Sequence, residues 1–184
     1  MSGMGHNRGP SLEPGFGFRR HAWSKARADL LPRLPLEIVR IRVARAKRLG
    51  LDYRTYATIR ATSGRDIVAF LYSGNALGLR PGRVEIAADL RDSLADIDAA
   101  RLAAVYAPAQ PRAVEAANPG VIDMAGRAPG FTETWRATRD QLGALLTQAA
   151  VPRDGVVLVA ATAVERDWCA AAGLAGLLSA ERLG

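Results

Sequence analysis

The stretch that decides the fold is Arg65–Leu77, RDIVAFLYSGNAL. Residues 67–73 form an apolar run with the length and composition of a buried strand, and they lead into a loop of small residues that begins at Ser73. In α/β folds, ligands gather in the loops that follow the carboxyl ends of the strands. The stretch therefore predicts a buried first strand with a candidate binding loop behind it.

The remainder of the chain repeats this pattern of short apolar runs followed by helical segments. Strands separated by helices predict a parallel sheet covered on both faces, because parallel strands need crossover connections. We therefore expect an α/β domain over residues 66–184, built as a three-layer, Rossmann-like parallel sheet. Residues 176–183 fit either a last edge strand or a helix. The other expected strands are 102–107, 120–125 and 155–162, and the expected helices are 86–100, 110–117, 132–149 and 163–172.

Charge is distributed unevenly along the chain. The net charge is +7, yet residues 1–65 contain 14 Arg and Lys against 4 Asp and Glu, whereas residues 66–184 contain 11 against 14. A basic segment beside a mildly acidic domain predicts an anionic partner, either nucleic acid or an acidic protein surface. A solvated basic face is the alternative interpretation. The candidate contact residues are Arg40, Arg42, Arg45, Lys47, Arg48 and Arg54.

The basic first third also has its own organisation. Residues 1–22 mix Gly, Pro, Asn and Arg without a period, and we expect a flexible basic tail there. Residues 23–65 are expected to form a basic helical segment, in which one helix ends at Gly50 and the next is capped by Asp52. This is the outline of a helix-turn-helix, while a helical cap packed on the domain and a protein docking surface are the alternatives. A helix-turn-helix would direct Arg54, Thr55 and Thr58 towards base edges.

The expected domain contains few of the residue types that commonly act as nucleophiles, bases or metal ligands. Residues 22–184 contain no histidine, which excludes catalytic triads that use imidazole and histidine zinc sites from this part of the chain. The single cysteine, Cys169, falls in an apolar helical pattern, where a thiol usually behaves as a small hydrophobic group. We therefore expect no catalytic residue, no metal site and no cofactor.

The loop after the first strand is the candidate ligand site. Its glycines depart from the spacings of dinucleotide-binding and P-loop motifs. Backbone N–H groups behind a parallel strand can still hold a phosphate group. Asp123, which we expect near the end of the strand over 120–125, is the best placed carboxylate. The candidate ligand-binding residues are Ser73, Gly74, Asn75, Gly78, Arg80 and Asp123.

Two stretches resemble the haloacid dehalogenase superfamily of α/β hydrolases. Phe70–Leu77, FLYSGNAL, is similar to the family's opening strand and loop, whose pattern is Phe-Asp-x-Asp-Gly-Thr-x-Leu. Residues 155–181 are similar to its late strand and helix. The resemblance implies that the fold is retained and phosphoryl transfer is lost. Leu71 stands at the position of the nucleophile, Ser73 at that of the acid/base and Ala161 at that of the metal ligand, while Gly74 matches the family pattern.

These observations predict a non-catalytic binding or regulatory protein whose arginine-rich N-terminal helical segment engages an anionic partner. One alternative is a small phosphate-ligand-binding enzyme of the haloacid dehalogenase-like type, and another is a subunit of a larger homo- or hetero-oligomeric assembly. No apolar run approaches the roughly 20 residues of a membrane span. A lone cysteine suits a reducing compartment, so we expect a cytoplasmic protein without membrane contact.

Overall fold

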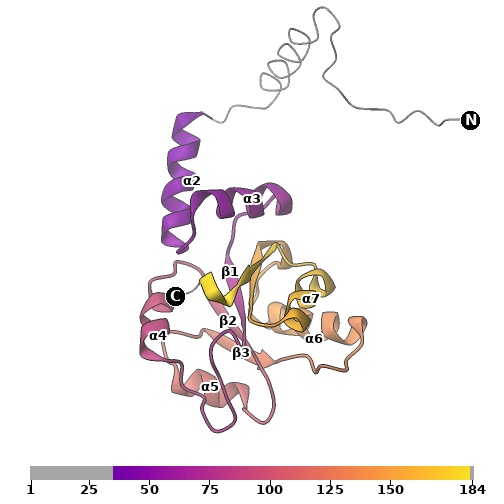
Figure 1. Ribbon diagram of the computed structural model, residues 1–184. Coiled ribbons are helices and arrows are strands. Elements are labelled where there is room, and N and C mark those ends of the chain that lie inside the picture. Colours follow the sequence, from indigo (N-terminus) through magenta and orange to yellow (C-terminus); the bar gives the residue numbers. More distant parts are fainter. Residues whose placement is uncertain (1–34, 183–184) are drawn as a thin grey trace, which may run out of the picture. The chain divides into compact units, whose positions relative to one another are not determined.

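The structure, a computed structural model, describes residues 35–182 (Figure 1). The basic tail expected over 1–22, and the part of the helical segment that precedes Pro35, lie outside the described residues. Residues from Ile41 onward belong to one compact unit, and residues 35–40 belong to the other. Of residues 35–40, Leu36 and Ile38 have exposed side chains, and Arg40 pairs with Glu37 at 2.8 Å.

Five parallel strands in the described chain form a single sheet in the order β3-β2-β1-β4-β5 (Figure 1). The first strand is central because it pairs with β2 on one side and with β4 on the other. The expectation of an α/β fold with a parallel sheet is confirmed. The strands are β1 (Ala69–Ser73), β2 (Ala100–Val105), β3 (Met124–Arg127), β4 (Val156–Ala160) and β5 (Gly176–Ser179).

Helices pack against both faces of this sheet, as the continuous apolar strands require. Successive side chains of β1 point to opposite faces: Tyr72 packs in one core cluster with Ile59, and Leu71 packs in a second cluster with Trp168. The first cluster takes residues from α3, α4 and α5, and the second takes residues from α6 and α7. These helices are α3 (Tyr53–Ser63), α4 (Ala88–Ala95), α5 (Pro111–Ala117), α6 (Trp135–Gln148) and α7 (Ala163–Ala172).

Two predicted elements differ most from the structure in their bounds. The apolar run over 120–125 is not a strand throughout, because Val121 lies in a turn, Ile122 has no regular structure and only Met124 onward joins the sheet. Both Val121 and Ile122 are buried in the first core cluster, so their apolar character reflects packing and not strand pairing. The helix expected over 86–100 ends at Ala95, since β2 already begins at Ala100.

Before the sheet, the helix α2 (Leu36–Arg48) is followed by α3 after a short connection. Gly50 takes the left-handed conformation at a φ of 67°, which suits a residue without a Cβ at the end of a helix. Asp52 caps α3, because its side chain accepts a hydrogen bond from the N–H of Thr55. The helix end predicted at Gly50 and the helix cap predicted at Asp52 are therefore both confirmed.

Candidate functional site

The loop after β1 is shaped by its own polar groups. The Ser73 side chain is fully buried, and its Oγ accepts a hydrogen bond from the N–H of Ala76 at 3.1 Å. The N–H of Leu79 donates to the carbonyl of Gly74 at 2.9 Å, which closes the loop, and Gly78 has a φ of 67°. Of the candidates predicted from the sequence, Ser73 therefore stabilises the turn, while Asn75 and Arg80 line a cavity at the carboxyl ends of β1 and β2.

A buried carboxylate, Glu165 of α7, lies at the carboxyl edge of β1 and β4. Its Oε1 accepts hydrogen bonds from Asn75 Nδ2 at 2.7 Å and from the Tyr106 hydroxyl at 3.2 Å. Its Oε2 accepts from the N–H groups of Ala161 and Thr162, both at 2.9 Å. Two neighbouring strands whose connections leave towards opposite faces define the crevice in which such sheets usually bind ligands. Here the carboxylate and its four donors occupy that crevice.

The contact with Glu165 also keeps the Tyr106 hydroxyl protonated. Burial raises the pKa of its phenol, and the neighbouring Glu165 carboxylate raises it further, so the hydroxyl remains protonated and donates. Sequence reasoning missed Glu165, although the stretch from Thr162 to Glu165 carries the signal of a capping box, which the structure contains. What the signal does not reveal is that the same carboxylate is buried and reaches β1.

Beside this cluster, a cavity of about 180 Å³ opens at the carboxyl ends of β1 and β2. Asn75 and Arg80 line it together with the stacked rings of Tyr106 and Phe131, whose centroids are 5.2 Å apart. Arg80 pairs through its backbone with Arg83, and both side chains are exposed. The cavity therefore combines an aromatic wall with a guanidinium, which suits a small anionic ligand that has a planar body.

Asp123 does not belong to this site. It precedes β3 and therefore lies at the amino edge of the sheet, opposite the loop after β1. Its carboxylate accepts hydrogen bonds from the Arg101 backbone N–H at 2.7 Å and from Arg101 Nη2 at 3.0 Å. The expectation that Asp123 lies at a strand end is wrong, because the strand begins after it.

Arg45, which we expected at the surface for an anionic partner, is engaged within the chain. Its Nε donates to Asp66 Oδ2 at 3.0 Å, its Nη1 to Asp98 Oδ2 at 2.8 Å and its Nη2 to the carbonyl of Ile67 at 2.8 Å. Tyr56 donates its hydroxyl to Asp66 Oδ1 at 2.7 Å. Burial alone raises the pKa of Asp66, but the hydrogen bonds from Tyr56 and Arg45 outweigh it and hold this pKa below its usual value.

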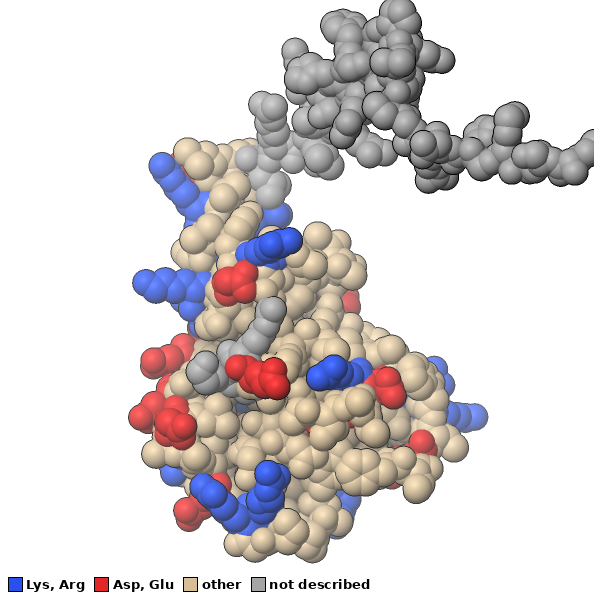
Figure 2. Space-filling view, viewed as in Figure 1, with Lys and Arg blue, Asp and Glu red and all other residues tan. Residues whose placement is uncertain are grey.

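The other cations of α2 face outward to different degrees. Lys47 and Arg48 are exposed and Arg42 is half-buried, and Figure 2 shows basic side chains standing out from α2. Arg48 lies 3.5 Å from Asp98, whereas no ion pair to Arg42 or Lys47 occurs in residues 35–182. On α2, the basic surface available to a partner after Ile41 therefore consists of Arg42, Lys47 and Arg48.

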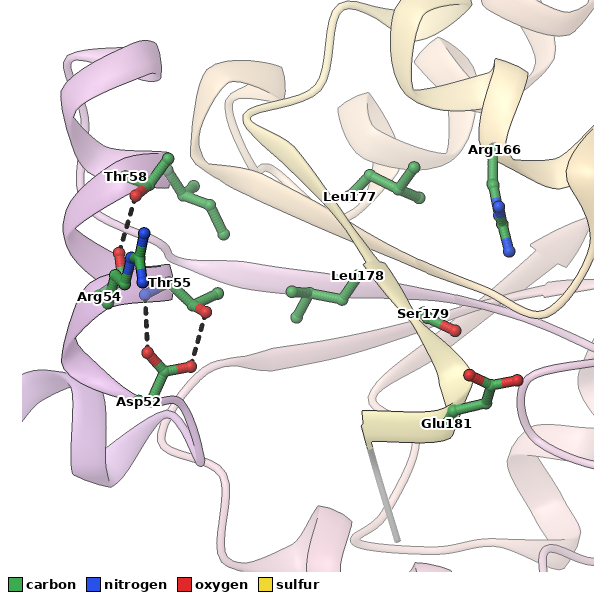
Figure 3. A pocket seen from close by; sticks show the side chains of 10 residues that line it. Asp52, Arg54, Thr55, Thr58, Arg166, Leu177, Leu178, Ser179 and Glu181 are labelled. Atoms are coloured by element: carbon green, nitrogen blue, oxygen red, sulfur yellow. Dashed lines mark hydrogen bonds between the residues drawn. The ribbon is translucent and has the colours of Figure 1, made fainter.

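The side chains expected to face DNA instead line a groove of about 690 Å³ between α3, β5 and α7. Figure 3 shows Arg54, Thr55 and Thr58 of α3 on one side of this groove, and Leu178 of β5 and Arg166 of α7 on the other. The hydroxyl of Thr58 donates to the carbonyl of Arg54 at 2.9 Å. Arg54 and Thr58 are exposed in this groove, and Thr55 is half-buried.

Comparisons with known proteins add no assignment: no protein-family model, curated protein or solved structure matches the chain. Within residues 35–182, no group of three or more His, Cys, Asp or Glu side chains is arranged to hold a metal ion. No helix of that part of the chain is long and apolar enough to cross a membrane. Cys169 is half-buried beside the second core cluster, and burial raises the pKa of its thiol.

Proposed function

We propose that the protein is a non-catalytic binding protein whose helix α2 docks on an acidic protein partner. The observation that carries the proposal is the composition of the α2 surface, defined as Ile41, Val43, Lys47 and Arg48. The side chains of Ile41 and Val43 are 64% and 45% exposed, although large aliphatic side chains normally pack in a core. Of the four cations in residues 41–48, Arg45 is paired with Asp66 and Asp98, which leaves Arg42, Lys47 and Arg48 to give the helix positive charge beside these apolar side chains.

This mixture favours a protein over a nucleic acid. Binding to phosphate backbones rests on cations and needs no exposed aliphatic side chains. Ile41 and Val43 lie about 160° apart around the helix axis, so a partner contacts both only if its groove encloses the exposed half of α2, with Lys47 and Arg48 between them. Binding of a helix in a partner's groove is a recurring mode of protein recognition. Electrostatic attraction between the α2 surface and an acidic partner would speed their association and fix the orientation of the helix.

The absence of catalysis is supported by Glu165. A carboxylate acting as a general base must reach the proton that it removes, whereas both oxygens of Glu165 accept hydrogen bonds from within the chain. Residues 22–184 offer no imidazole to replace it. The carboxyl edge of the sheet therefore supports binding and not chemistry.

Photo-crosslinking tests the docking surface directly. With benzoylphenylalanine at Ile41, we expect a crosslinked protein in the cells that make this chain, and none with the probe at exposed Ala144 of α6. Affinity between the chain and the purified crosslinked protein is then measured by titration. The double variant Lys47→Glu and Arg48→Glu is expected to weaken it about tenfold, because two attractive charges become repulsive.

The control for this experiment is Arg153→Glu, which changes an exposed cation at the amino end of β4. It is expected to leave the affinity unchanged. Crosslinks to nucleic acid at position 41, or an affinity that does not respond to the charge reversal, contradict a protein partner bound through α2.

A second candidate function rests on the cavity beside Arg80. We propose that the domain is a catalytically degenerate relative of the haloacid dehalogenases that still binds an anionic ligand. The central position of β1 supports this kinship, as does the loop behind the strand. Leu71, at the position of the nucleophile, is buried, and Ala161, at the position of the metal ligand, contributes its backbone N–H to Glu165.

Phenyl phosphate tests this candidate, because it pairs an aromatic ring with a phosphate. At ten times its Kd it is expected to raise Tm by about 3–5 °C. Arg80→Ala is expected to abolish the shift by removing the guanidinium, and Arg153→Ala serves as the matched control. Release of phosphate from p-nitrophenyl phosphate with Mg²⁺, or a Tm shift that persists in Arg80→Ala, contradicts non-catalytic binding at this cavity.

A further inference from the structure

A cavity of about 250 Å³ is lined by the loop before α6 and by the helices α6 and α7. These two helices cover the same face of the sheet (Figure 1). In residues 41–182, the large hydrophobic side chains that are exposed lie on α2, at Leu177 of β5 and around this cavity. Those around the cavity are Phe131, Trp135 and Val164, which are 66%, 55% and 44% exposed. A contiguous exposed apolar patch marks a contact site on a protein surface.

The aromatic part of the wall is held in place from within the chain. Although Phe131 is exposed, its ring stacks on that of Tyr106, with the centroids 5.2 Å apart and the planes inclined by 11°. Tyr106 in turn contacts the ring of Trp168 at 5.9 Å and donates to Glu165. Trp168 is 3% exposed and forms the base of the cavity. A wall that is already ordered loses little conformational entropy when a partner binds.

The charged groups that line the cavity are both acids, Glu133 and Asp167. Both are exposed, and within residues 35–182 neither carboxylate has an ion pair or a side-chain hydrogen bond. The neighbouring cations are directed elsewhere: Arg136 lies 3.6 Å from Asp140, and Arg166 lines the groove of Figure 3. The cavity therefore combines aromatic rings with two carboxylates that no cation of the described chain neutralises.

We propose that this cavity, named here the Trp135 cavity, binds an arginine side chain of a partner protein. A guanidinium stacks on aromatic rings and also donates paired hydrogen bonds to carboxylates, whereas an ammonium group acts as a point charge. The rings of Phe131 and Trp135 offer the stacking surface. The carboxylates of Glu133 and Asp167 offer acceptors and the complementary charge.

The size and position of the Trp135 cavity favour a side chain of a protein over a free small molecule. Its volume of about 250 Å³ lies below the roughly 300 Å³ at which small-molecule sites begin. It opens at the surface, since Glu133, Trp135 and Asp167 are all exposed. The inference goes beyond both proposed functions, because no residue is shared with the α2 surface and only Phe131 is shared with the cavity beside Arg80. Phe131 is therefore left unchanged in the test.

Two tripeptides that differ in one group test the proposal. Acetyl-Gly-Arg-Gly-amide and acetyl-Gly-citrulline-Gly-amide have the same shape, but citrulline carries a neutral urea in place of the guanidinium. Each peptide is titrated into the full chain, and the backbone amide shifts of α6 and α7 are followed by NMR. The arginine peptide is expected to bind about 3- to 30-fold more tightly, the sum of one cation–π contact and one exposed ion pair.

Two variants locate the site, and both change exposed side chains, so both are expected to fold. Trp135→Leu removes the indole ring, and Asp167→Asn removes the charge of one carboxylate. Each is expected to reduce the preference for the arginine peptide by about 2- to 5-fold. Asp92→Asn is the matched control, because it makes the same charge change at an exposed position of α4, which packs on the opposite face of the sheet. It is expected to leave the preference unchanged.

Three results overturn an arginine site at the Trp135 cavity. One is that the two peptides bind the wild-type chain equally or that neither binds. Another is that the preference is the same in Trp135→Leu as in the wild type, or that Asp92→Asn reduces it as much as Asp167→Asn does, since net charge alone then attracts the peptide. The third is that tetramethylammonium binds more tightly than the arginine peptide, because that cation donates no hydrogen bond to a carboxylate.

Discussion

Glu165→Ala is expected to lower the free energy of unfolding by about 3–5 kcal/mol, the loss typical of breaking a buried charged network. Four donors converge on this carboxylate, from Asn75, Tyr106 and the backbone of Ala161 and Thr162. Alanine leaves all four donors without this acceptor, three of them on the half-buried residues Asn75, Tyr106 and Thr162, and also removes the capping box of α7. Urea unfolding followed by circular dichroism measures the loss.

Two variants make this result specific. Asp167→Ala removes an exposed carboxylate from the same helix and is expected to change stability by less than about 0.5 kcal/mol. Glu165→Gln keeps the shape but places an amide donor among donors, so its loss is expected to approach that of alanine. If Glu165→Gln were as stable as the wild type, the negative charge would contribute nothing and the account of the crevice would be wrong.

The fold could be predicted because it depends on local patterns. The apolar run before Ser73 is long enough for a buried strand but not for a helix. Helix α7 lies over 163–172, as predicted, and it is capped by Thr162 at its start and by Gly173 at its end. The prediction of a strand over 120–125 was wrong at its start, because Val121 and Ile122 are buried in the core and do not pair with a neighbouring strand. Periodicity cannot separate these two causes in so short a run.

The site could be predicted only in part, because its contacts join distant residues. The loop at Asn75 is visible in the sequence, but its partner Glu165 lies 90 residues away. The same limit applies to Arg45, whose carboxylate partners lie 21 and 53 residues further along the chain. Nothing in the local pattern distinguishes this arginine from the exposed Arg48, since only the tertiary structure places Arg45 between two acids and leaves Arg48 beside Asp98 alone.

Arg45→Met is expected to lower the free energy of unfolding by about 2–4 kcal/mol at pH 7. The Arg45 side chain is only 16% exposed, and its guanidinium binds Asp66, Asp98 and the Ile67 carbonyl, which methionine leaves without this donor. Since Asp66 is 36% exposed, water compensates it in part, and the loss stays below that of a fully buried pair. Arg48→Met, which removes an exposed cation 3.5 Å from Asp98, is the matched control and is expected to cost under about 0.5 kcal/mol.

The pH dependence of this loss identifies its cause. The pKa of Asp66 is lowered in the folded chain, so its contribution to stability is present above the unfolded value of about 3.9 and is lost as the pH falls through the folded pKa. Without Arg45, burial of Asp66 is less opposed and its folded pKa rises. The stability difference between wild type and Arg45→Met is therefore expected to be largest near neutral pH and to shrink below about pH 4. A difference that is constant from pH 7 to pH 3 would mean that Arg45 acts through packing of its aliphatic stem and not through its ion pairs.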